Sequence, residues 1–146
     1  MNAARRRSVV FTLSVLAIAV TGTACASRLP AVPVDVSVGG AGALPTPRAE
    51  PNDSTPEILK MRFSALDVRR GERWSGEFVT GTSVASVEVR TNLFSIDVPR
   101  TGYGRFGFDL NILDAPPIFI RAYQLRVIAR NSAGVEFEQD LPFEIR

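Results

Sequence analysis

Residues 123–130 read Tyr-Gln-Leu-Arg-Val-Ile-Ala-Arg, and this stretch decides the class of fold. Apolar and polar side chains alternate along most of its length, with a period of two residues. The apolar positions of the alternation are Tyr123, Leu125, Val127 and Ala129. Successive side chains of a strand point to opposite faces, so the pattern predicts a β-strand with one face in a core.

The same alternation recurs in six further runs, separated by short breaks rich in Gly, Pro or Asn. No stretch of comparable length has the period of a helix. The apolar positions of these runs are Leu59, Met61, Phe63; Trp74, Gly76, Phe78; Ala85, Val87, Val89; Phe94, Ile96, Val98; Phe106, Phe108, Leu110, Ile112; and Val135, Phe137, Leu141, Phe143, Ile145. Seven short strands predict an all-β domain over residues 57–146: a seven-stranded antiparallel β-sandwich with Greek-key connections, or a partly closed barrel. Trp74 and Tyr123 are predicted core residues.

Two of these strands carry a resemblance to known modules. Residues 123–134 continue as Asn-Ser-Ala-Gly after Arg130, and the whole stretch is similar to the penultimate strand of immunoglobulin-like and fibronectin type III-like domains. Gly104-Arg-Phe-Gly-Phe108 resembles the strand before it in bacterial immunoglobulin-like domains, and Trp74 is similar to the core tryptophan of fibronectin type III modules. The chain differs from antibody-type domains in lacking a cysteine pair and a tryptophan on the third strand. The resemblance implies an immunoglobulin-like sandwich, a fold that serves adhesion, adaptor, sugar-binding and spacer roles.

Residues 1–24 have the layout of a secretory signal peptide. Arg5-Arg6-Arg7 form a positive n-region, residues 9–20 are uncharged and apolar, and small residues come after them. The apolar run is shorter than the roughly twenty residues of a comfortable membrane span. An uncleaved anchor and a twin-arginine signal are the alternatives.

Cys25 is the only cysteine, so it has no partner within the chain for a disulfide. Residues 22–25, Gly-Thr-Ala-Cys, resemble a bacterial lipobox, although Gly22 stands where a branched aliphatic residue is usual. The resemblance implies cleavage before Cys25, lipidation of Cys25 and a membrane anchor without a transmembrane helix. Ala26 after the cysteine favours the outer membrane, by resemblance to enterobacterial sorting. The alternative is ordinary cleavage after Ala26 and a soluble exported protein.

Residues 25–56 differ in composition from residues 57–146, where apolar and polar residues alternate. They contain six of the ten prolines and the run Gly39-Gly40-Ala-Gly42, which together predict a flexible tether rich in Pro, Gly and Ala. A short strand could form where valines alternate at positions 32–38. Pro33 has no N–H to donate, so such a strand belongs at a sheet edge.

Composition argues against several classes of function. There is no histidine, which is the commonest general base and metal ligand. Residues 57–146 carry 12 basic and 12 acidic side chains, so the domain lacks the positive charge of a nucleic-acid binder. Residues 102–107 contain G-x-G-x-x-G but open a strand rather than a helix, which predicts a hairpin. We expect no enzyme activity, no cofactor, no metal site and no nucleic-acid partner.

Three acidic residues in the last run, Glu136, Glu138 and Asp140, share one strand face. Alternation places them in solvent, where charge protects a sheet edge. A second polar face combines Glu88 and Arg90 with residues of the 123–130 strand, and cross-strand ion pairing accounts for it.

The loop at residues 99–105 is the predicted binding site, with Tyr103 between Arg100 and Arg105. Tyrosine and arginine are enriched at binding hot spots. The sequence therefore predicts a non-enzymatic, lipid-anchored protein of the cell envelope whose domain binds another envelope protein. The alternatives are a module that binds cell-wall glycan through Tyr103, and a passive structural spacer.

Overall fold

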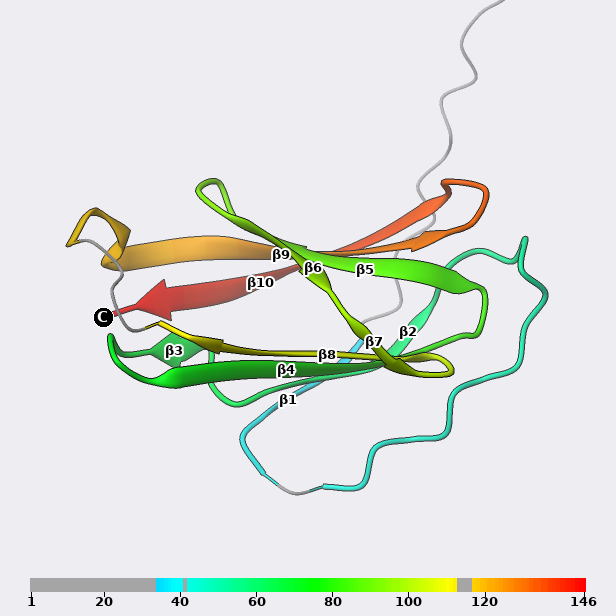
Figure 1. Ribbon diagram of the computed structural model, residues 1–146, viewed down its shortest axis with the longest axis horizontal. Helices are drawn as coiled ribbons and strands as arrows, with labels where there is room; N and C mark the ends of the chain where they lie inside the picture. The colour runs from blue at the N-terminus through cyan, green and yellow to red at the C-terminus, as the bar shows by residue number, and fades with distance from the viewer. Residues whose placement is uncertain (1–33, 41, 113–116) are drawn as a thin grey trace, which may run out of the picture.

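The computed structural model describes residues 34–40, 42–112 and 117–146 (Figure 1). The predicted signal peptide and Cys25 lie outside these ranges. The described chain forms two five-stranded sheets that face one another (Figure 1). The first sheet has the order β1 (Asp35–Val38), β2 (Ile58–Phe63), β4 (Arg73–Thr80), β8 (Arg105–Asn111), β7 (Arg100–Gly102). The second has the order β3 (Asp67–Val68), β10 (Glu136–Ile145), β9 (Arg121–Asn131), β5 (Val84–Arg90), β6 (Ser95–Val98), and one 3-10 turn, η1, spans Pro117–Phe119.

The all-β prediction is confirmed, and the seven predicted runs correspond to β2, β4, β5, β6, β8, β9 and β10. The prediction of seven purely antiparallel strands needs correction. Three short strands, β1, β3 and β7, join the edges, and two pairs are parallel: β1 with β2, and β3 with the end of β10. Both sheets are therefore mixed.

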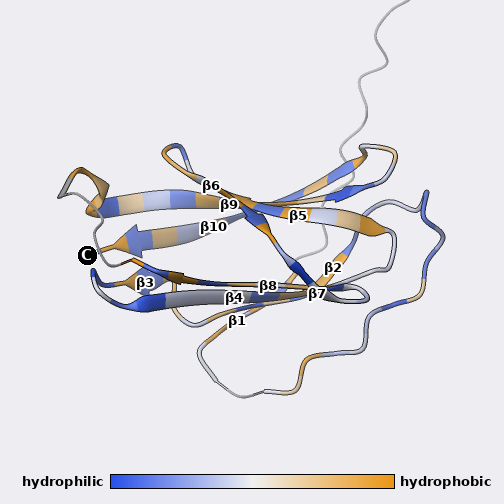
Figure 2. Cartoon of the chain, in the orientation of Figure 1, coloured by the Kyte–Doolittle hydropathy of each residue, from blue (hydrophilic) through white to orange (hydrophobic). Residues whose placement is uncertain are grey.

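Apolar side chains of the two sheets meet in one buried core cluster. Figure 2 shows hydrophobic and hydrophilic residues alternating along the strands. Trp74 is buried at the centre, with ring centroids 4.7 Å from Phe108 and 4.6 Å from Phe143. Its indole Nε1 donates to the Ala65 carbonyl at 3.0 Å, so the polar end is satisfied. Tyr123 is also buried. The prediction that both rings belong to the core is confirmed.

The segment 42–56 follows the surface of the sandwich and is held there by hydrogen bonds (Figure 1). Thr82 N donates to Arg48 O at 2.9 Å, and Glu50 N donates to Thr82 Oγ1 at 2.8 Å. Further along, Asn131 Nδ2 donates to Ser54 O at 3.0 Å. The described part of the predicted tether over 25–56 is therefore attached to the domain. Its predicted edge strand is present as β1.

Consecutive strands β6 and β7 carry the chain from one sheet to the other. β6 pairs with β5 in the second sheet, and after Pro99 the chain joins the first sheet as β7, beside β8. β7 pairs with only Arg105 and Phe106 at the start of β8. Beyond Gly107, the outer edge of β8 has no neighbouring strand among the described residues. The sandwich is thus left open on one side. Within the described ranges, no helix has the length and apolarity needed to cross a membrane.

Candidate interaction surfaces

The predicted binding residues lie on the hairpin formed by β7 and β8, but two of the three are engaged inside the domain. Arg100 donates to the carbonyls of Val84 and Ala85 at 2.7 and 3.1 Å, and its guanidinium lies 4.9 Å from the centroid of Phe106. Arg105 donates to Pro45 O at 3.1 Å and so holds the segment 42–56. Both arginines therefore have structural roles in the fold.

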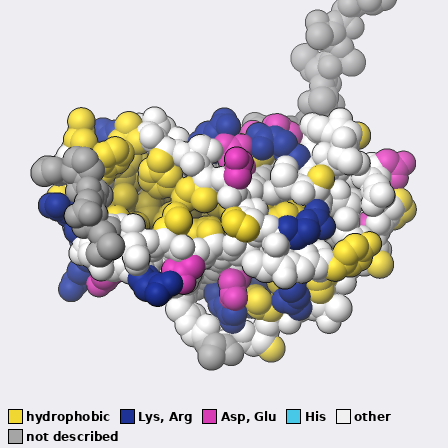
Figure 3. Space-filling view, in the orientation of Figure 1, with side chains coloured by type: hydrophobic (Ala, Val, Ile, Leu, Met, Phe, Trp, Pro, Cys, Tyr) yellow, Lys and Arg dark blue, Asp and Glu magenta, His cyan; other side chains and the backbone are white. Residues whose placement is uncertain are grey.

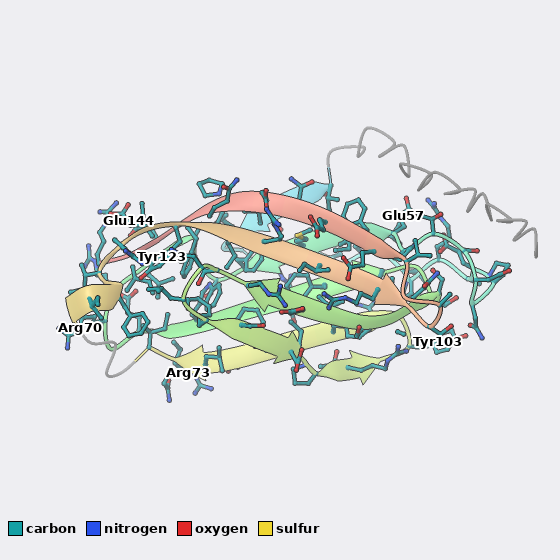
Figure 4. The ribbon with its side chains drawn as sticks, turned by 90° about the horizontal axis from the view of Figure 1, so that it is seen from above. Glu57, Arg70, Arg73, Tyr103, Tyr123 and Glu144 are labelled. Carbon is teal, nitrogen blue, oxygen red and sulfur yellow. The ribbon has the colours of Figure 1, made fainter. Side chains whose placement is uncertain are left out.

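Tyr103 is the exposed member of the predicted trio. It occupies the turn of the β7–β8 hairpin, as predicted for residues 102–107, and 74% of its surface is exposed. Figure 4 places it at one end of the sandwich, away from the buried Tyr123. The structure thus presents one aromatic ring to solvent at this end rather than a cluster of three side chains.

The outer face of the second sheet carries a network of ion pairs that runs across three strands. Arg130 on β9 contacts Glu88 on β5 at 2.8 Å and Glu136 on β10 at 2.6 Å. Arg126 contacts Asp140 at 2.8 Å and Glu138 at 3.7 Å. Cross-strand pairing on this face, as predicted, is confirmed. The three acidic residues of β10 therefore face arginines rather than one another.

Glu88 is the most buried charge of this network, with 7% of its side chain exposed. Burial alone would raise the pKa of its carboxyl group. Hydrogen bonds from Ser95, Arg130 and Arg90 outweigh burial and lower the pKa to about 2. Glu88 is paired across the strands with Ile128, which is also buried. Glu88 is thus a stable anion that joins three strands.

An apolar strip lies on the open side of the sandwich, and we define it as Phe94, Ile96, Leu110 and Ile112. Figure 3 shows hydrophobic side chains gathered over this face between the two sheets. Leu110 has the inward parity of the buried Phe106 and Phe108, yet it is 37% exposed. The other three are half-buried against the core. Leu93, Ile118 and Ile120 are also exposed apolar side chains of the described chain.

The backbone of β8 also faces this open side. Gly107 N donates to Pro99 O, in the segment that crosses between the sheets, at 3.0 Å. The N–H of Gly107 therefore points away from β4. Ile112 points toward β4: its N–H donates to Glu72 O, and its carbonyl accepts from Gly71 N, both at 3.0 Å. Because the direction of N–H and C=O alternates along an antiparallel strand, Asp109 and Asn111 present theirs to the open side. No described strand takes up these four groups.

A shallow cleft of about 550 Å³ adjoins the open side where β9 begins, lined by Asn92, Arg121, Ala122, Tyr123 and Gln124. Arg121 lies over the ring of Tyr123 at 5.3 Å, and no described carboxylate pairs with it. Arg69 and Arg70 also have no ion-pair partner among the described carboxylates. Their turn contacts the end of β8 through Gly71, and Figure 4 places Arg70 at the same end as Tyr123.

The described residues contain no group of three or more His, Cys, Asp or Glu side chains arranged to hold a metal ion. No protein-family model matches the chain, and no curated protein matches it in sequence. Any inference about function therefore depends on the surfaces of the domain itself. Of these, the apolar strip and the edge of β8 were missed by the sequence reasoning. The exposed edge depends on the chain leaving the second sheet at Pro99, which alternation does not reveal.

Proposed function

We propose that the protein is a non-enzymatic, lipid-anchored protein of the cell envelope whose immunoglobulin-like sandwich binds another envelope protein. The observation that carries this proposal is the open side of the sandwich. Its apolar strip leaves Leu110 exposed although its position on β8 is that of a core residue. A contiguous exposed apolar surface between polar surroundings is typical of a protein interface.

Strand order supports the immunoglobulin-like assignment. When the three short strands are set aside, the first, second and fifth of the seven main strands (β2, β4 and β8) form one sheet. The third, sixth and seventh (β5, β9 and β10) belong to the other, as in immunoglobulin folds. The fourth strand, β6, lies beside the third.

Tyr123 supports the same assignment. It lies near the start of β9, the sixth main strand, and its hydroxyl donates to the carbonyl of Phe119, four residues upstream, at 2.7 Å. This position and this backward bond are similar to those of the tyrosine corner in immunoglobulin-like sandwiches.

Co-purification tests the proposed function. The tagged full-length protein is compared, in cells of the source organism, with a variant that keeps residues 1–33 and lacks the domain. We expect one stoichiometric envelope protein to accompany the full-length chain and to be lost with the domain. A partner that stays with the variant lacking the domain would contradict the proposal.

Glycan binding through the β7–β8 turn is the second candidate, because Tyr103 is the most exposed large side chain among the described hydrophobic residues. Aromatic rings such as tyrosine stack on sugars. We expect Tyr103→Ala to leave the free energy of unfolding within about 0.5 kcal/mol of the parent, as for surface residues in general. If the module binds cell-wall glycan, the same variant loses retention on purified cell wall. Unchanged retention rules this candidate out and favours the protein partner.

A further inference from the structure

The edge of β8 lacks the features that usually protect an exposed strand from pairing. Natural edges are blunted by proline, by lysine or by unneutralised charge. β6 is followed directly by Pro99, whereas residues 105–112 of β8 and its end contain neither proline nor lysine. The one charge near the open part of the edge, Asp109, is neutralised by a bidentate pair with Arg73 at 2.6 and 3.1 Å. The open part of this edge can therefore form backbone hydrogen bonds with another strand.

The apolar strip fits the side chains that such a strand would bring. Leu110 and Ile112 lie two residues apart on one side of the opening, and Phe94 and Ile96 lie two residues apart on the other. A strand repeats its side-chain direction every two residues, about 6.6 to 6.8 Å. Phe94 lies 6.5 Å from Trp74 and 6.4 Å from Tyr123, ring centroid to ring centroid, so side chains entering here would extend the existing core.

The surrounding charge favours an acidic occupant. Arg121 borders the cleft at the start of β9, and Arg69 and Arg70 lie in the turn that contacts Ile112. These three arginines have no ion-pair partner among the described carboxylates. Glu72, in the same turn, accepts a hydrogen bond from the backbone N–H of Arg69 at 3.1 Å, and Asp67 and Glu144 are paired with Arg146, so arginines still outnumber carboxylates at this end. An incoming carboxylate at this end would be attracted, and an incoming ammonium group would be repelled.

We propose that the open side accepts one extended segment of another polypeptide, which pairs with β8 through the backbone of Asp109 and Asn111. The segment has apolar residues at every second position and an acidic residue at the end that lies beside Arg70 and Arg121. Backbone hydrogen bonds supply affinity, and the apolar strip selects the alternating side chains. This inference rests on the proposed function and specifies the partner and the surface that it uses.

Site-specific photo-cross-linking in cells of the source organism tests the inference. A photoreactive residue replaces Asn111 in the tagged full-length protein, and in parallel proteins it replaces Tyr103 or Lys60. Lys60 serves as a control because it lies on β2, two strands from β8 in the first sheet. We expect an adduct from position 111 alone, in which the cross-linked peptide alternates apolar and polar residues and carries a nearby acid.

Two matched variants of Asn111 separate backbone pairing from side-chain contact. Asn111→Pro removes an N–H that points to the open side and that β4 does not use, so we expect it to fold with a nearly unchanged melting temperature. Asn111→Ala retains the N–H. With the photoreactive residue moved to Asp109, we expect the proline variant to lose at least 10-fold in adduct yield and the alanine variant to keep it. Arg121→Glu should reduce the yield about 10-fold through repulsion of the acidic residue.

Each other outcome contradicts a definite statement. Adducts that form only from position 103 would overturn the β8 surface while leaving the proposed adaptor function intact. Adducts from no position, together with no co-purifying protein, would overturn both. An adduct from position 109 that survives the Asn111→Pro substitution would overturn strand pairing, and so would an adduct from position 111 whose partner peptide is helical or wholly polar.

Discussion

Glu88 lies on the outer face of the second sheet, where its carboxylate accepts hydrogen bonds from Ser95, Arg90 and Arg130. The pKa of Glu88 is about 2 in the folded protein and 4.5 ordinarily. The folded state therefore gains stability above pH 4.5 and loses it as the pH falls toward 2. The ionisation of Glu88 therefore makes the free energy of unfolding depend on pH in the acidic range.

We expect Glu88→Gln to lower the free energy of unfolding by about 3 kcal/mol at pH 7, because the amide lacks the charge that three partners bind. At pH 2 the difference between the two proteins should shrink strongly. Urea unfolding at both pH values measures this. Glu77→Gln is the control: Glu77 is half exposed and pairs with Arg62, so its loss costs about 1 kcal/mol or less. Equal losses for Glu88→Gln at both pH values would contradict the prediction.

Gly104 is a second residue whose identity is constrained by its surroundings. Its φ is +62°, and a β-carbon there would lie 2.6 Å from Cβ of Pro47 and 3.0 Å from the carbonyl of Thr80. We expect Gly104→Ala to cost about 2–3 kcal/mol, the sum of backbone strain and the displacement of the segment 42–56. Gly134→Ala is the matched control, since φ is +81° but the space is open. It should cost about 1 kcal/mol in thermal or urea unfolding, and an equal cost for both would refute the contact with Pro47.

At the scale of elements, attachment of the segment 42–56 is open to direct measurement. Thr82 Oγ1 accepts from Glu50 N and donates to Glu50 O, at 2.8 and 3.1 Å. Thr82→Val removes both bonds, each contributing about 1 kcal/mol. We expect trypsin to cleave after Arg48 about 30-fold faster in this variant, because the population of the locally opened state limits cleavage and about 1.4 kcal/mol corresponds to a factor of ten. Thr101→Val, on the exposed face of β7, should leave the rate unchanged; similar acceleration would show that the bonds at Thr82 do not hold the segment.

Alternation was sufficient to predict the strands of four or more residues and insufficient for β3 and β7, which are shorter. β9 has four inward apolar residues at every second position. A run with this period can bury all its apolar side chains on one face only as a β-strand. β3 has two residues and β7 has three, too few to display a period. Their pairing is decided by the neighbours that the fold brings to them. The same holds for Arg100: its place on a hairpin could be predicted, but its bonds to Val84 and Ala85 could not.

For the whole molecule, membrane attachment through Cys25 is the prediction with the simplest experimental test. Each buried methylene of an acyl chain contributes about 0.8 kcal/mol, so two or more chains anchor a protein stably. We expect Cys25→Ala to shift the protein from the membrane fraction to the soluble fraction after cell lysis. Ala26→Ser, which keeps the cysteine, should remain with the membrane. A Cys25→Ala variant that stays in the membrane fraction would indicate an uncleaved anchor instead.

The position of β1 bears on how the domain would be presented to its partners. With the segment 42–56 and β1 attached to the sandwich, only residues 25–33 remain between the proposed lipid and the described domain, and they span at most about 30 Å. β1 is one edge strand of the first sheet, and β7, next to β8, is the opposite edge strand. A linker that joins the domain at β1 would turn that edge toward the bilayer. The opposite edge would then face the aqueous compartment. A linker this short would limit the distance of the domain from the membrane surface. It would also limit the orientations in which the domain meets other molecules.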